Sequence, residues 1–333
     1  MRKPNAQHYK QTYMKNKILA SLLVANLGLG LAETSAHWTS KRPDGHAPIG
    51  VMADHKHGKG EWMASYRYMF MEMEGIDTFG PYTMMRPTSM DMEMHMFGAM
   101  YAPSDKVTLM LMGNHIEKDM GMINMGGMTS NMNTSDWGDL TLSGLFDIKS
   151  WGEETLIGSI GLGMPTGSID LKNGAGAQLP YGMQTGSGTW DLKPGITYLG
   201  QNESYSWGAQ ANATIRLGDN DHGYSFGDNI SLTGWAAKKL NDNLSISARL
   251  NAHFLGSIDG TDENITMMMA GMSAPNDASN SGGQVYSAGV GFNYLFTNGH
   301  RLALEYTNAF ENDLNGYQME FDSTVTVGWQ YAW

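Results

Sequence analysis

Methionine is concentrated in the first third of this 333-residue chain. Of its 28 methionines, 19 lie between Met52 and Met132. Thioethers are soft ligands that select Cu(I), and imidazoles bind either copper ion, so this region could hold copper. The candidate ligands are His55 and His57 in one short stretch, and the thioethers of Met120, Met122, Met125 and Met128. Alternatively, methionine is only an adaptable apolar filler, and the protein needs no cofactor.

The stretch from Met90 to Met96 alternates methionine with Asp91, Glu93 and His95. Alternate side chains of a β-strand point to opposite faces, so the thioethers share one face and the ionisable groups share the other. Charge that faces lipid near the middle of a membrane is costly. If this strand is part of a membrane barrel, we therefore expect its ionisable groups to face the lumen and its methionines to face lipid.

Ionisable residues on other polar strand faces extend this candidate set. The residues expected to line the lumen are Arg67, Asp91, Glu93, His95, Asp139, Asp147, Asp191, Lys193, Arg216, Arg249, His253, Arg301 and Glu305. Both signs of charge occur in the set. The residues could therefore screen solutes in a polar channel, or pair with one another across a packed, non-conducting interior.

The end of the chain shows the clearest strand pattern. From residue 321 onward, one face carries Val325, Val327, Trp329, Tyr331 and Trp333, and the other face is small or polar. A tilted transmembrane strand needs about 9–11 residues, and this pattern recurs along the chain. We expect 12 strands, at 61–74, 90–101, 107–117, 137–148, 154–165, 189–200, 204–217, 229–239, 244–255, 284–296, 301–310 and 319–333. Ten or fourteen would also be compatible with the pattern.

Short turns and long polar loops alternate between these strands. The long loops are expected at 75–88, 118–136, 166–188, 218–228, 258–283 and 311–318. Short periplasmic turns and longer extracellular loops are typical of outer-membrane barrels. The fold class is therefore all-β, a transmembrane antiparallel β-barrel. The alternative, a secreted soluble all-β domain, explains neither the two loop classes nor the aromatic closing strand.

The N-terminal region reads as a targeting segment. Lys15 and Lys17 precede a short apolar run and the small residues that end at Ala36, which is the order of a signal peptide. We expect a signal peptide over 1–36, with Met14 as an alternative start and Ala32 as a second cleavage position. A histidine-containing periplasmic segment over 37–59 then precedes a barrel over 60–333.

Composition limits the remaining functions. The net charge of -12 disfavours nucleic acid as a partner, because phosphates are bound by Lys and Arg. The chain has no cysteine, so it has neither disulfides nor thiolate sites. We also expect no enzymatic activity, because no spacing singles out a nucleophile with its histidine base.

Three stretches resemble a known family. They are HAPIGVMADH at 46–55 leading into GEWMASYRYM at 60–69, DMEMHMFGAMYAP at 91–103, and LPYGMQTGSGTWDL at 179–192. They are similar to the outer-membrane transporter-like proteins of the meta-pathway phenol degradation family. The resemblance implies a barrel in the bacterial outer membrane that takes part in passing small molecules, with phenols as the suggested class. It transfers no catalytic residue.

The sequence thus favours an outer-membrane channel that passes small solutes by passive diffusion. One alternative is a copper-related barrel that uses its Met- and His-rich region, and another is a structural barrel without a pore. The expected partners are membrane lipid, a small solute, and the barrel assembly machinery, which would recognise the strand ending at Trp333.

Overall fold

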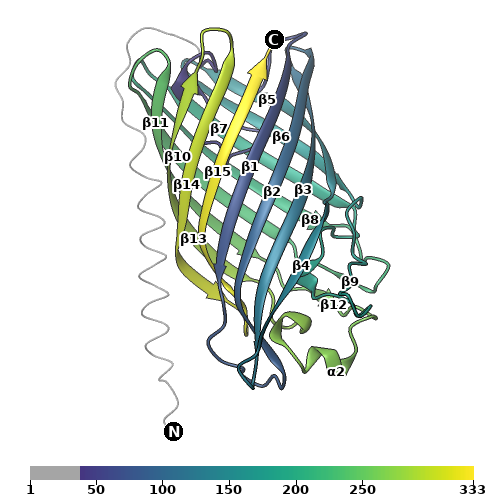
Figure 1. Ribbon diagram of the computed structural model, residues 1–333. Coiled ribbons are helices and arrows are strands. Elements are labelled where there is room, and N and C mark those ends of the chain that lie inside the picture. Colours follow the sequence, from purple (N-terminus) through teal and green to yellow (C-terminus); the bar gives the residue numbers. More distant parts are fainter. Residues whose placement is uncertain (1–37) are drawn as a thin grey trace, which may run out of the picture. The chain divides into compact units, whose positions relative to one another are not determined.

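Twelve long strands form a closed antiparallel barrel in the computed structural model, which describes residues 38–333 (Figure 1). The expected signal peptide at 1–36 lies outside the described residues. The barrel strands are β1 (Trp62–Glu74), β2 (Met85–Ser104), β3 (Val107–Asn124), β5 (Leu140–Trp151), β6 (Glu154–Met164), β7 (Asp191–Gln201), β8 (Tyr205–Arg216), β10 (Asn229–Lys239), β11 (Leu244–Leu255), β13 (Gly283–Leu295), β14 (His300–Leu314) and β15 (Glu320–Ala332). The expected strand count is confirmed.

The ring closes where β1 pairs with β15, from Met63 opposite Ala332 to Glu74 opposite Glu320. Every backbone group of a membrane-spanning sheet must be paired internally, because lipid offers no hydrogen-bond partner. Several strands begin and end at the expected residues. β10 and β11 match the sequence analysis at both ends, because alternating side chains and compact turns mark their limits.

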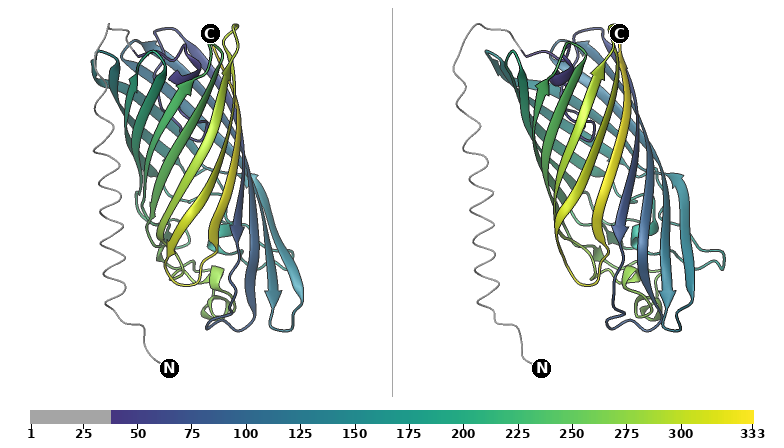
Figure 2. Two further views of the ribbon diagram at one scale, coloured as in Figure 1. Left: turned by 90° about the vertical axis from the view of Figure 1, so that its left-hand side faces the viewer. Right: turned by 60° about the vertical axis from the view of Figure 1, so that its left-hand side comes forward.

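The expected loop at 118–136 is wrong. β3 continues to Asn124, and β4 (Thr129–Trp137) pairs back on it, so that only residues 125–128 form the turn. The polar composition of this stretch suggested a loop, but its alternation of side chains is that of a strand. β5 follows β4 after a break at Gly138, whose N–H donates to Asn114 O. The β2–β3–β4 sheet extends past the rest of the wall (Figure 2).

The connections lie in two classes at opposite ends of the barrel. Tight turns follow β2, β5, β7, β10 and β13, at the end where β1 begins and β15 finishes. Longer connections lie at the other end. They contain the elements η2 (Tyr181–Met183), β9 (Tyr224–Ser225), β12 (Asp259–Gly260), α2 (Met267–Ala270) and η3 (Ala274–Asn276). Short turns mark the periplasmic end of such barrels. Within residues 38–333, no helix is both long and apolar enough to cross a membrane.

The two faces of β2 are the reverse of the expected arrangement. Met94 and Met96 line a cavity in the lumen, so Asp91, Glu93 and His95, which alternate with them, face outward. The expectation that these three residues line the lumen is wrong. Their outward partners come from β1.

Two tyrosines of β1 stabilise the polar groups of β2 on the outer surface. Tyr66 Oη lies 2.7 Å from His95 Nδ1, and Tyr68 Oη donates to Glu93 Oε2 at 2.8 Å. The same outer face of β3 carries Glu117. Charge is costly against hydrocarbon and cheap near headgroups. This polar row therefore marks the level at which β2 and β3 leave the membrane core.

The inward methionine face can be tested on two adjacent residues of β3, because the chain has no native cysteine. Met112 lines the lumen cavity, whereas Leu111 is 47% exposed on the outer face. In proteoliposomes, we expect Met112→Cys to react with a small charged methanethiosulfonate reagent and Leu111→Cys to be protected by lipid. The opposite labelling pattern, read by mass spectrometry, would reverse the assignment of faces.

Candidate functional site in the barrel lumen

The segment before β1 lies inside the barrel. We call residues 38–59 the plug; this segment, purple in Figure 2, lies inside the barrel near the end with the tight turns. Its Ala47, Ile49 and Val51 are buried. The expectation of a separate periplasmic segment at 37–59 is therefore wrong for these residues. Local sequence could not reveal this, because the wall groups that hydrogen-bond the backbone of residues 43–52 come from strands 158 to 255 residues away.

Side chains of the barrel wall hold the plug by its backbone. Donors on the wall reach several plug carbonyls. Among these bonds are Ser245 Oγ to Pro43 O at 2.9 Å, Asn293 Nδ2 to His46 O at 3.2 Å, Arg301 Nη2 to Ala47 O at 2.6 Å, and Gln210 Nε2 to Met52 O at 2.9 Å. Each such bond contributes about 1 kcal/mol net. The plug is thus held by many weak bonds, an arrangement that allows release.

Gly50 of the plug lies directly against a buried ion pair of the wall. Its N–H donates to Glu305 Oε2 at 2.8 Å, and Glu305 Oε1 pairs with Arg249 Nε at 2.6 Å. A Cβ at position 50 would lie 2.5 Å from Arg249 Nη2 and 2.6 Å from Glu305 Oε2. Glycine is therefore required here, because any side chain would collide with a buried ion pair.

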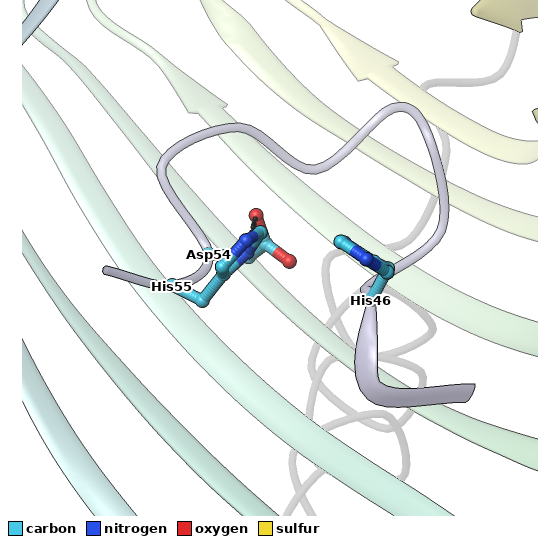
Figure 3. Close-up of side chains that lie close together, drawn as sticks. All are labelled: His46, Asp54 and His55. Carbon is cyan, nitrogen blue, oxygen red and sulfur yellow. Dashed lines mark ion pairs between the residues drawn. The ribbon is translucent and has the colours of Figure 1, made fainter. Parts of the chain in front are cut away.

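Three plug residues could together bind a metal ion. Ligand atoms of His46, Asp54 and His55 all lie within 4.8 Å of one another (Figure 3). Burial lowers the pKa of His46 well below its ordinary value and lowers the pKa of His57 to about 3. Burial opposes ionisation of Asp54, but His55 beside it holds the pKa of that carboxyl below its ordinary value. His46 and His57 are thus neutral and the carboxylate charged at neutral pH.

The four candidate thioethers of the expected copper site do not converge. Met120 and Met122 are buried in the lumen and pack in an apolar cluster with Met183. Met125 and Met128 lie at the tip of the β3–β4 hairpin, with 61% and 69% of their surface exposed. A single site that combines all four is therefore wrong, because β3 carries two of them inward and the hairpin carries the other two outward.

A cavity of about 610 Å³ lies above the plug. One wall consists of methionine side chains from β2 and β3, and the opposite wall is polar and charged. The floor is formed by Met52 and Ala53 of the plug, and Tyr181 and Gln184 reach in from the loop after β6. Part of the long loop expected at 166–188 thus folds into the lumen.

The charged wall joins several residues that the sequence analysis placed in the lumen. Asp191 forms an ion pair with Arg216, and Lys193 lies beside them. Asp139 accepts hydrogen bonds from Ser187 N at 2.8 Å and Ser187 Oγ at 2.7 Å.

The other expected lumen residues lie on inner faces but outside the cavity. Arg67, Arg249, Arg301 and Glu305 lie at the level of the plug, where Arg67 Nη1 contacts Met52 Sδ at 3.8 Å. Asp147 pairs with Lys56 of the plug at 2.6 Å. His253 shares the inner face of β11 with Arg249, nearer the loop end.

One histidine that the sequence analysis passed over links three extracellular loops. His222 Nδ1 lies 3.1 Å from Asp262 Oδ2, and His222 Nε2 lies 2.9 Å from Asp170 Oδ1. Residues 223–227 match the hydrolase pattern Gly-x-Ser-x-Gly, but they form no strand-to-helix elbow. Both ring nitrogens of His222 are occupied by carboxylates, so neither is available to a serine.

Residues 77–321 match the family model described as "Putative MetA-pathway of phenol degradation". The chain belongs to this family. Among solved structures, it is similar to the COG4313 outer membrane channel from Pseudomonas putida F1, with 13% identity, 84% of this chain and 98% of that chain covered, and a TM-score of 0.59. The transport unit of the autotransporter AIDA-I from Escherichia coli is similar at 11% identity, with 84% and 93% covered and a TM-score of 0.50.

No curated protein sequence matches the chain. The family match and the closed barrel identify it as a bacterial outer-membrane protein, and the expected location is confirmed. At these identities the two solved structures show the shared fold alone. They do not show which solute enters the lumen of this chain.

Release of the plug can be tested at Gly50. We expect Gly50→Val to displace the plug, because the new side chain would overlap the Arg249–Glu305 pair. Losing even one bond of about 1 kcal/mol raises the undocked fraction about fivefold, and single-channel conductance in planar bilayers should rise with it. Gly144→Val is the matched control, because it makes the same exchange on the outer face of β5, where a Cβ meets no atom within 4 Å. Equal conductance of both variants would argue against the plug as the barrier.

Proposed function

We propose that this barrel passes small, weakly acidic aromatic solutes across the outer membrane by passive diffusion. The observation that carries the proposal is the cavity above the plug, which sets a wall of thioethers opposite a wall with cationic groups. Such a cavity suits a molecule with an aromatic ring and one acidic oxygen. Phenols and aromatic carboxylates have that chemistry.

The thioether wall suits the ring. Met94, Met96, Met110 and Met112 present flexible, polarisable side chains to the cavity. Sulfur–aromatic contacts contribute about 0.3–1.5 kcal/mol each, which is weak enough to let a solute leave again. A flexible wall also adapts to rings with different substituents, so the proposed selectivity is for a class of solute and not for one compound.

The charged wall suits the acidic oxygen. Lys118, Lys193 and Arg216 outnumber the carboxylates of Asp139 and Asp191 around the cavity. Both carboxylates already have partners, Ser187 and Arg216. Lys118 Nζ donates to two carbonyls of the inward loop, at 2.8 and 2.6 Å. Among residues 38–333, Lys193 forms no direct hydrogen bond or ion pair. We therefore propose that its ammonium group binds the acidic oxygen of the solute.

Passage to the periplasm requires the plug to move. The plug forms the floor of the cavity, and Gly58 and Gly60 connect it to β1. Gly60 adopts a φ of 85°, a left-handed conformation that favours glycine. We propose that the plug swings on this connection while the barrel wall stays rigid, because the bonds that hold the plug are individually weak.

The outer surface is proposed to interact with lipid and with the assembly machinery. Tyr331 stacks on Trp333 with ring centroids 5.4 Å apart, and such aromatic girdles lie at membrane interfaces. We propose that the barrel assembly machinery recognises this outward aromatic edge of β15 during insertion.

The role of Lys193 can be measured by uptake into proteoliposomes. The Lys193→Gln variant lacks the positive charge, which removes about 1 kcal/mol of attraction for an anion. We therefore expect it to take up benzoate about fivefold more slowly, with uptake of neutral benzyl alcohol unchanged. Lys238→Gln is the matched control, because Lys238 lies on the outer face over the Tyr205 ring. Equal slowing of both solutes would contradict the assigned role. If the Gly50→Val protein also takes up neither solute, the barrel is not a channel.

A further inference from the structure

The plug contains a buried group of side chains that the proposed solute path does not use. His46, Asp54 and His55 face one another across a loop of the plug (Figure 3). His55 is 1% exposed and Asp54 is 6% exposed. Buried polar groups in proteins are almost always hydrogen-bonded, so the partners of these three residues are informative.

Several ring nitrogens in and beside this group lack hydrogen bonds. In residues 38–333, fifteen buried polar side-chain atoms have no hydrogen bond, and four of them are ring nitrogens of His46, His55 and His57. His55 Nδ1 lies 3.0 Å from Asp54 Oδ1 but not in hydrogen-bond geometry. Each unsatisfied group costs about 1–3 kcal/mol. Such a concentration of unpaired nitrogens indicates a ligand that accepts their lone pairs.

We propose that His46, Asp54 and His55 bind one divalent transition-metal ion of the zinc, nickel or copper(II) class. Mixed imidazole and carboxylate ligands suit these ions, whereas magnesium and calcium prefer oxygen alone. His57, whose ring lies 5.1 Å from that of His55 and whose Nε2 is unpaired, neighbours the group but is outside this ligand set. The site lies outside the lining of the solute cavity and uses none of the thioethers first considered for copper.

The surroundings of Asp54 are built to present one oxygen to such an ion. Asp54 Oδ2 accepts from Ala47 N at 3.0 Å, which leaves Oδ1 toward His55. Hydrogen bonds of this kind orient metal ligands. Ala53 adopts a φ of 55°, a strained conformation for a residue with a Cβ. The neighbouring Arg301 donates to Ala47 O and to Asn293 Oδ1. These acceptors partly compensate its positive charge, which would otherwise repel a cation.

A bound ion would fasten the plug to two sides of the barrel. The backbone of His46 is held by Asn293 of β13, and His57 N donates to Thr108 Oγ1 of β3 at 3.0 Å. An ion that joins His46 to the 54–57 stretch closes this loop and links both anchors. The metal would therefore stabilise the docked plug.

Calorimetric titration of the full chain, folded in detergent, with Zn(II), Ni(II) and Cu(II) tests the proposal. We expect one ion per chain, and affinity at least tenfold lower in His55→Gln and in Asp54→Asn. His95→Gln is the matched control, because it makes the same exchange on the outer face, and it should bind as the wild type does. Heat-dependent gel mobility checks that each variant is folded.

A second measurement needs no variant. The electron paramagnetic resonance spectrum of the Cu(II) form should show coupling to at least two nitrogens. Absence of binding by the folded protein, or wild-type affinity in the His46→Gln/His55→Gln protein, would overturn the proposal.

Discussion

The hydrogen-bond ladder between β1 and β15 closes the sheet, and the rest of the molecule depends on that closure. An unpaired backbone group in hydrocarbon costs several kcal/mol, so an open edge would not persist in the membrane. Closure also divides space into a lumen and a lipid side. Each strand then presents one face to the lumen and the other face to lipid. Because side chains alternate along a strand, each residue faces one of two chemically different surroundings.

The polar inner wall explains why the plug and the cavity can share one lumen. Short donors such as Ser245 and Gln210 satisfy plug carbonyls near the periplasmic end. Nearer the loops, the same kind of wall carries Asp191 and Arg216, which pair with each other and line the cavity. A plug held by its backbone needs few specific side chains. Its own side chains, His55 among them, are thereby available for another purpose.

The outer surface of β2 and β3 shows that polar residues do not always mark the lumen. Glu93 and His95 are hydrogen-bonded to Tyr68 and Tyr66 on the outer face, where these strands pass beyond the hydrocarbon. The methionines opposite them then line the lumen. An apolar inner wall opposite a charged one makes the cavity amphipathic.

The sequence by itself determined the all-β barrel class, the limits of elements such as β10 and β11, and the two classes of connection, because these follow from local alternation and turn chemistry; it favoured twelve strands over ten or fourteen. Only the tertiary structure decided which face of β2 points inward, since a period of two looks the same when its faces are exchanged. It also brought His46 to Asp54 and His55, and placed the plug against Glu305. The contact of Gly50 with Glu305 joins residues 255 positions apart, and only closure of the barrel around the plug defines it.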